Sequence, residues 1–148
     1  MKQRADRLRR ILALAATEER RLAAQTGRSQ ARLNEQRARL LELHQHRRTY
    51  GRRTPETGNL PAAHWKDYQR FLGRLDQAVR SQQQIITDCE RSLDLHRRRW
   101  QVKRQRVESL QQVVDRAEAA ARRDADRREQ RTLDDLPAGR HGFEPGCP

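Results

Sequence analysis

Residues 65–100 read WKDYQRFLGRLDQAVRSQQQIITDCERSLDLHRRRW, and they carry a seven-residue repeat of apolar side chains. The repeat continues beyond this segment, and its members are Trp65, Leu72, Val79, Ile86, Leu93, Trp100, Val107, Val114 and Ala121. The alternate seam position is mixed: Tyr68, Leu75, Gln82, Cys89, His96, Lys103, Leu110 and Ala117. A strict seven-residue repeat of this length predicts a helix that supercoils against a partner helix with left-handed twist.

The first third of the chain supplies a candidate partner helix. It repeats the same spacing more weakly, and its apolar members are Leu8, Leu12, Ala15, Leu22, Leu33, Leu40, Leu43 and Tyr50. Good helix formers dominate there, and the alternation typical of strands is absent. Helix-breaking residues gather between Gly51 and Pro61, which predicts a connection between two helices.

The predicted fold is therefore all-α: one long antiparallel two-helix coiled-coil hairpin with unequal helices. We expect helices at residues 4–50 and 61–136 joined by a loop at 51–60, and these form a single domain, residues 1–136. Gly51 suits the left-handed backbone conformation that follows a helix C-terminus. Residues 137–148 are rich in glycine and proline and are expected to form a disordered tail.

Folding the two helices back at this loop predicts their register. Leu33 then faces Val79, Leu22 faces Leu93 and Leu12 faces Trp100, while Glu19 falls near His96 and could form a polar layer. Beyond about residue 110 the second helix outruns the first. The side chains expected to lie uncovered there are Val113, Val114, Ala117, Ala120 and Ala121. An uncovered stripe favours a protein interaction site, although side chains this small can also tolerate water.

Composition and charge limit the classes of function. Hydrophobic residues make up 34% and aromatic residues 4%, too little for a large globular core, and the formal net charge is +13. This charge makes nucleic acid or an anionic membrane surface a candidate partner. Cys89 lies inside a helical pattern and Cys147 is the penultimate residue, so neither calls for a disulfide framework, and a reducing, cytosolic compartment is expected. Neither a secretory signal nor a membrane-spanning run is expected.

No pattern in the sequence predicts catalysis, a cofactor or a metal site. Glycine-rich phosphate loops and nucleophile turns are absent, and His44 and His46 lie two apart, on different faces of a helix. The basic run from Arg97 to Arg106 could grip phosphates, but Trp100 within it fits the apolar seam. We therefore favour a coiled-coil surface for this run and expect no enzyme activity.

Aromatic residues gather on both sides of the predicted loop. Tyr50 ends the first helix, and Trp65, Tyr68 and Phe71 open the second. Phe71 lies one place off the seam position Leu72, so it should be partly exposed. These rings either close the end of the hairpin or anchor a partner, and the sequence leaves both interpretations open.

The segment Trp65-Lys66-Asp67-Tyr68-Gln69-Arg70-Phe71-Leu72, together with Leu75, Ala78-Val79, Trp100 and the closing Arg128-Glu129-Gln130-Arg131, resembles the FliJ family. Its members are coiled-coil proteins of the bacterial flagellar type III export apparatus. The resemblance implies a non-enzymatic, stalk-like protein, cytoplasmic and peripherally associated with the inner membrane. The implied partners are a hexameric export ATPase, the cytoplasmic domain of the export gate protein and export chaperones, and the implied processes are flagellum biogenesis, motility and chemotaxis.

The resemblance also implies two sets of partner-binding residues. The gate-facing set lies near the hairpin tip: Leu43, Tyr50, Phe71, Leu75 and Ala78. The set facing the ATPase ring lies at the helix ends: Arg7, Arg10, Val114, Ala117, Ala121, Arg122, Arg123, Arg127 and Arg128.

Three alternatives remain open at this point. The first is a basic coiled coil that binds nucleic acid, as the net charge allows. The second is the equivalent stalk of a virulence type III secretion system, which these residues barely distinguish. The third is a structural homodimer in which helices pair between two chains.

Overall fold

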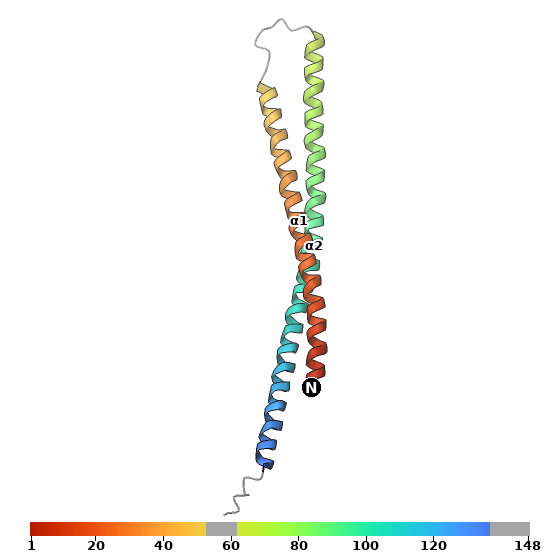
Figure 1. The fold of residues 1–148 in the computed structure, drawn as a ribbon. Coiled ribbons are helices and arrows are strands. Elements are labelled where there is room, and N and C mark those ends of the chain that lie inside the picture. The colour runs from red at the N-terminus through yellow and green to blue at the C-terminus, as the bar shows by residue number, and fades with distance from the viewer. Residues whose placement is uncertain (53–61, 137–148) are drawn as a thin grey trace, which may run out of the picture. The chain divides into compact units, whose positions relative to one another are not determined.

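The computed structural model describes residues 1–52 and 62–136, and this part of the chain is almost entirely helical. Helix α1 spans Lys2–Arg52 and helix α2 spans Ala62–Asp135 (Figure 1). The chain divides into two compact units, and each unit takes a segment from each helix. The middle unit is Arg20–Val102. The terminal unit combines Met1–Glu19 with Lys103–Pro148, of which residues 103–136 are described.

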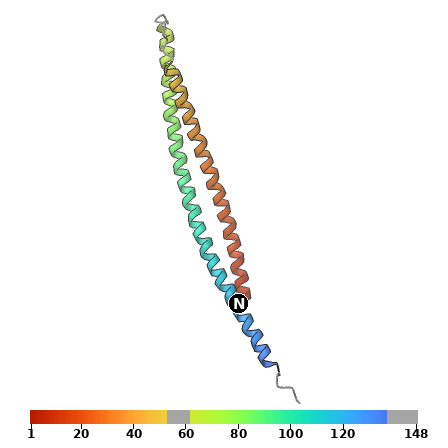
Figure 2. The same ribbon diagram turned by 90° about the vertical axis from the view of Figure 1, so that its left-hand side faces the viewer.

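The middle unit is an antiparallel pair of helical segments, seen side by side in Figures 1 and 2. Its core is built from seam residues: Leu33, Ile86, Cys89 and Leu93 are buried together, and Leu40 packs against them. Contacts run antiparallel, because Gln36 of α1 meets Gln82 of α2 while Tyr50, further along α1, meets Tyr68, earlier on α2. The apolar repeat therefore forms the helix interface, as a coiled coil requires.

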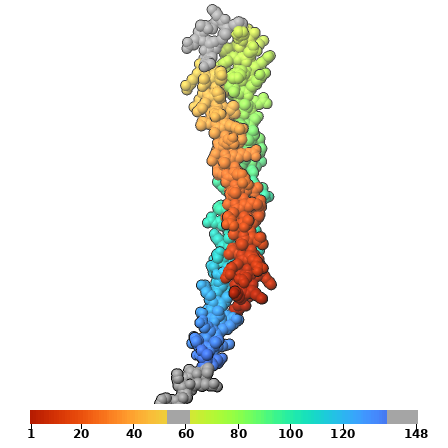
Figure 3. Space-filling view, viewed as in Figure 1, coloured from red at the N-terminus to blue at the C-terminus, as the bar shows by residue number. Residues whose placement is uncertain are grey.

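The terminal unit pairs the start of α1 with the last third of α2. Ala5, Ala15 and Val114 are buried in it, and Val114 is only 2% exposed. Arg9 of α1 bonds to Glu118 of α2, and Met1, just before α1, shares a pocket lining with Arg128, later on α2, so the two segments run antiparallel here as well. Figure 3 shows the first residues of α1, in red, covering part of α2 in this unit.

The predicted fold class is confirmed in its main features: all-α, with two unequal helices that pack antiparallel. The helices are longer than expected at both ends of the first and one residue shorter at each end of the second. Gly51 was expected in the left-handed conformation, and this prediction is wrong. Gly51 lies within α1, and no described glycine has a positive φ. The rest of the predicted loop and the predicted disordered tail, 137–148, lie outside the described residues.

Gly51 remains helical because its turn is held from α2. Tyr68 donates a hydrogen bond from its hydroxyl to the Tyr50 carbonyl, and Phe71 packs edge-on against the Tyr50 ring. These contacts occupy one of the carbonyl groups that a helix otherwise leaves without an intrahelical partner at its C-terminus. The last turn of α1 is therefore stabilised by tertiary contacts rather than by a glycine cap.

The predicted register is wrong by about one heptad. Leu33 was expected to face Val79, but it is buried with Ile86, seven residues further along α2. The expected partner of Leu93, Leu22, does not pack against this core either. The cause lies where α1 ends: Tyr50 meets Tyr68 and Phe71, so the first turns of α2 precede the paired region. The predicted pair Leu12–Trp100 and the predicted layer of Glu19 and His96 join residues of different units and stay predictions.

The register also changes the stripe that was expected to be uncovered. Val114 is buried, and Ala117, Ala120 and Ala121 are half-buried, because the start of α1 reaches them. Val113 is the exposed member of this set. The part of α2 in which every side chain is exposed begins later, at residue 125. It comprises residues 125–135, and Leu136 after the helix is exposed as well.

Candidate partner-binding surfaces

The first candidate surface, the aromatic surface, comprises the predicted gate-facing residues Leu43, Tyr50, Phe71, Leu75 and Ala78. The structure brings the two rings of this set together: the centroids of Tyr50 and Phe71 lie 4.9 Å apart with an interplanar angle of 78°. This edge-to-face arrangement is favourable for aromatic pairs. Phe71 remains 39% exposed, which confirms the partial exposure predicted from its place beside the seam. Leu43, Leu75 and Ala78 are half-buried.

Neighbouring contacts hold the aromatic surface in shape. Arg47 Nε donates to Asp76 Oδ1 at 2.8 Å, linking the two helices next to Tyr50. The ring of His46 stacks on Tyr50 with centroids 6.4 Å apart, and the rings of Trp65 and Tyr68 lie 5.8 Å apart. The aromatic residues therefore fit both interpretations, closure of the hairpin end and anchoring of a partner. Tyr50 and Tyr68 join the two helices, whereas Phe71 and Trp65 keep exposed ring surface.

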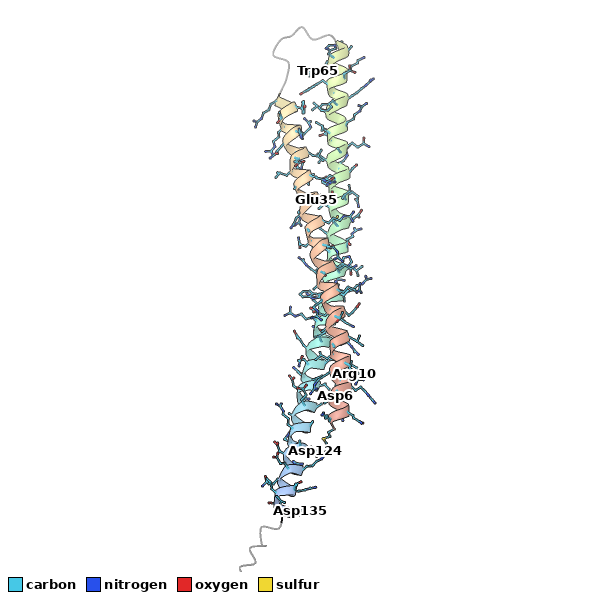
Figure 4. All side chains as sticks on the ribbon, viewed as in Figure 1. Asp6, Arg10, Glu35, Trp65, Asp124 and Asp135 are labelled. Atoms are coloured by element: carbon cyan, nitrogen blue, oxygen red, sulfur yellow. The ribbon has the colours of Figure 1, made fainter. Side chains whose placement is uncertain are left out.

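The second candidate surface, the basic surface, comprises six exposed arginines of the terminal unit: Arg7, Arg10, Arg122, Arg123, Arg127 and Arg128. Arg128 bonds to Asp124 at 2.7 Å, one turn away on α2. Figure 4 shows Asp6 and Arg10 near the start of α1, and Asp124 on α2. Val114, which the resemblance groups with these arginines, is buried in the helix interface, so its side chain is not available to a partner.

An ion pair between the helices fixes the basic surface, and no pattern in the sequence predicts it. Arg9 Nε donates to Glu118 Oε1 at 2.5 Å, and a second nitrogen of Arg9 bonds to Asp6 at 3.0 Å. The Glu118 carboxylate raises the pKa of Arg9, first through the hydrogen bond and then through its negative charge. Arg9 therefore stays charged and links both helices.

The middle unit contains a polar contact inside its seam that depends on the register. Gln82 Nε2 donates to Gln36 Oε1 at 2.7 Å and to the Gln36 carbonyl at 3.0 Å, and both side chains are buried. Gln82 is a seam position of the repeat, and Gln36, three residues after Leu33 and four before Leu40, continues the same spacing in the first helix. Only a correct register pairs them, so the contact was missed.

The basic run Arg97–Arg106 is built as a coiled-coil surface. Arg98 bonds to Asp94 at 2.9 Å and Arg104 to Glu108 at 3.3 Å, each one turn away on α2. Arg97 donates to Gln30 of α1 at 2.7 Å. Trp100 is half-buried. These contacts fit the interpretation in which Trp100 belongs to the seam and the arginines line its flanks.

Two other features, a metal-binding cluster and a membrane-spanning helix, are absent from the described residues. Within 1–52 and 62–136, no group of three or more His, Cys, Asp or Glu side chains is arranged to hold a metal ion. Neither helix, over its described length, has an 18-residue stretch apolar enough to cross a membrane.

Comparisons with known proteins point in one direction. The model of a protein family described as "Flagellar FliJ protein" matches residues 3–142. The flagellar FliJ protein of Salmonella typhi is 31% identical over 72 residues, which are 49% of this chain and 49% of that protein. The matched region therefore spans about half the length of this curated relative. No solved structure matches the chain.

Proposed function

Because the chain belongs to the family of flagellar FliJ proteins, we propose that it is a non-enzymatic, stalk-like component of the flagellar type III export apparatus. In this role it links the export ATPase ring to the cytoplasmic domain of the export gate protein and handles export chaperones. It acts in the cytoplasm, at the inner-membrane export apparatus, and serves flagellum assembly, motility and chemotaxis.

The terminal unit carries this proposal. Ala5 is buried in its interface and Ala117 and Ala121 are half-buried, together with larger half-buried side chains such as Leu8 and Leu110. A single helix with its side chains is roughly 10–12 Å across. The result is a slender two-helix segment with arginines on its outside, a shape and charge suited to entering the opening of a ring with an acidic lining.

The aromatic surface supplies the second contact in the proposal. Phe71 is an exposed ring whose position is fixed by Tyr50, and Tyr50 is itself held by Tyr68. A ring that is already ordered loses little conformational entropy when it binds, which makes it a good anchor for a partner. This surface belongs to the middle unit, whereas the basic surface belongs to the terminal unit.

A reconstitution experiment tests the ring contact. The purified chain is added to its cognate export ATPase, and ATP hydrolysis and hexamer assembly are measured. We expect both to increase, and we expect the double substitution Arg122→Glu with Arg127→Glu to abolish the increase. A matched control, Arg70→Glu with Arg74→Glu, makes the same change in charge on exposed positions of the middle unit. It should retain the increase.

The gate contact is tested separately with the isolated cytoplasmic domain of the gate protein. Phe71→Ala should weaken binding by about tenfold, as loss of an aromatic anchor does. Leu41→Ala removes another exposed apolar side chain outside the aromatic surface and should have little effect.

Rates of ATP hydrolysis and hexamer assembly that are equal with and without the chain would refute the stalk role. Tight DNA binding that persists at physiological salt would instead favour the nucleic-acid alternative.

A further inference from the structure

The middle unit has a recess on one side of its helix pair. Its volume is about 450 Å³, and Arg28, Ser29 and Arg32 of α1 line one wall. Ile85, Ser92 and His96 of α2 line the other. Residues spaced three or four apart share a helix face, which explains how each helix presents a wall. Ser29 and Ser92 are small, so space remains where larger side chains would fill the groove.

The recess has an excess of positive charge. Arg28 and Arg32 lie one turn apart on the same face of α1, where like charges repel. Neither forms an ion pair with any residue in the described ranges. The acidic residue on the lining is Asp88, whose carboxylate accepts a hydrogen bond from Gln84 at 3.1 Å. An incoming anion would relieve the repulsion between the two arginines.

A buried nitrogen of His96 lacks a hydrogen-bond partner among the described residues. This atom, Nδ1, is inaccessible to solvent. Buried polar atoms are nearly always hydrogen-bonded, and leaving one without a partner costs about 1–3 kcal/mol. Nδ1 donates in one tautomer of the imidazole and accepts in the other, so it requires an acceptor or a donor accordingly.

Apolar surface lies directly beside these charges. Ile85 is 40% exposed on the lining, and Leu95, three residues after Ser92 on α2, is 48% exposed. A carboxylate can pair with the two arginines, and an aliphatic side chain can cover the exposed surface of Ile85. The recess therefore combines the two kinds of contact that an amphipathic acidic peptide makes.

We propose that this recess binds an acidic, leucine-containing helical segment of a protein partner. A Glu or Asp carboxylate of that segment lies between Arg28 and Arg32, and an aliphatic side chain covers Ile85. A nucleic acid fits less well, because no Phe, Tyr or Trp side chain lines the recess for base stacking and the exposed aliphatic surface of Ile85 has no counterpart in a phosphate backbone. This proposal does not depend on the stalk role, since it concerns neither the aromatic surface nor the basic surface.

Binding of a defined probe to the full chain tests the proposal. The probe is a fluorescein-labelled helical peptide of Glu and Leu with blocked ends, and its binding is followed by fluorescence anisotropy at about 150 mM salt, where long-range charge effects are screened. Arg28→Gln with Arg32→Gln should weaken binding by about tenfold or more, because two charge-assisted contacts are lost. Ser92→Trp should also weaken it by filling the recess without changing the charge.

Matched controls separate the recess from general charge. Arg70→Gln with Arg74→Gln removes the same charge from exposed positions one turn apart on α2 and should leave binding within about twofold. A peptide with Gln in place of Glu should bind weakly to the unaltered chain. Circular dichroism checks that each variant stays helical.

Three results would overturn the proposal. One is absence of binding by the acidic peptide to the unaltered chain. Another is equal binding by the Arg28/Arg32 variant and the Arg70/Arg74 variant. The third is a single-stranded oligothymidylate that binds more tightly than the peptide and loses its affinity in the Arg28/Arg32 variant, which would assign the recess to a phosphate backbone.

Discussion

The middle unit and the terminal unit use the same helices with different interfaces. In the middle unit, the large aliphatic side chains of Leu33 and Leu93 are buried in the core, and two glutamines are buried with a hydrogen bond between them. In the terminal unit, the buried residues among those described are two alanines and one valine, Val114, and the larger apolar side chains are only half-buried or exposed. Both exteriors are rich in charge, so the units differ chiefly in what lies between their helices.

This difference assigns stability and register to the middle unit. Burying a leucine side chain contributes about 1.5–3 kcal/mol, whereas an alanine has little side-chain area to bury. The terminal unit buries fewer large side chains, and its arginines lie exposed outside this interface. The comparison can be tested by substitutions in each unit, measured as changes in the free energy of unfolding.

The largest effect is expected at the core of the middle unit. Leu33 is 2% exposed, so Leu33→Ala removes buried contacts and leaves a cavity, and it should lower the free energy of unfolding by about 2–4 kcal/mol. Urea denaturation followed by circular dichroism measures it. Leu41→Ala, at a position 55% exposed, should change stability by less than about 0.5 kcal/mol. Equal effects at both positions would contradict the core described above.

The glutamine pair should give the next largest effect. Gln82→Leu leaves the buried Gln36 amide without its partner and should cost about 1–3 kcal/mol. The double substitution Gln36→Leu with Gln82→Leu should recover most of the loss, because no polar side chain then stays buried. A double-mutant cycle measures the coupling. If Gln82→Leu alone is as stable as the unaltered chain, the glutamine pair does not contribute to stability.

A smaller loss is expected in the terminal unit. Val114→Ala removes two buried methyl groups and should cost about 1.5 kcal/mol. Hydrogen exchange should show faster opening in residues 103–124, with protection around Leu33 unchanged. Exchange that rises equally in both units would argue against treating the units as separate sources of stability.

The smallest effect is expected for the ion pair between Arg9 and Glu118. Both groups are accessible to solvent, so the coupling energy from Arg9→Gln and Glu118→Gln should be small and should fall as salt rises. The pKa of Arg9 is raised by folding, so its contribution is present at all pH values below the ordinary pKa of arginine. It would be lost only as pH rises through the still higher folded value. A coupling that does not respond to salt would contradict this.

The fold class followed from the sequence because an unbroken seven-residue repeat has few other solutions. The register did not follow, since sliding one helix by a heptad keeps apolar residues facing apolar residues. Leu33 meets an apolar seam position opposite either Val79 or Ile86. Only contacts that occur once, such as Tyr50 with Tyr68, distinguish these arrangements.

The candidate surfaces show the same division: the exposure of a side chain could be predicted from its place in the repeat, but contacts between the helices could not. Exposure of Phe71 followed from its place beside the seam, and exposure of the arginines followed from their places outside it. Burial of Val114 and the ion pair of Arg9 with Glu118 required the correct register. The recess required it too, because its two walls come from segments more than fifty residues apart in the sequence.

The glutamine pair has a mechanical consequence. A slide of seven residues would place Gln36 opposite Leu75 or Cys89 and leave buried amide groups without partners, at about 1–3 kcal/mol per group. The middle unit therefore resists shear along the helix axis more strongly than an all-aliphatic interface of equal area would. A pull or push on one of its helices passes to the other as a load, instead of being absorbed by slippage.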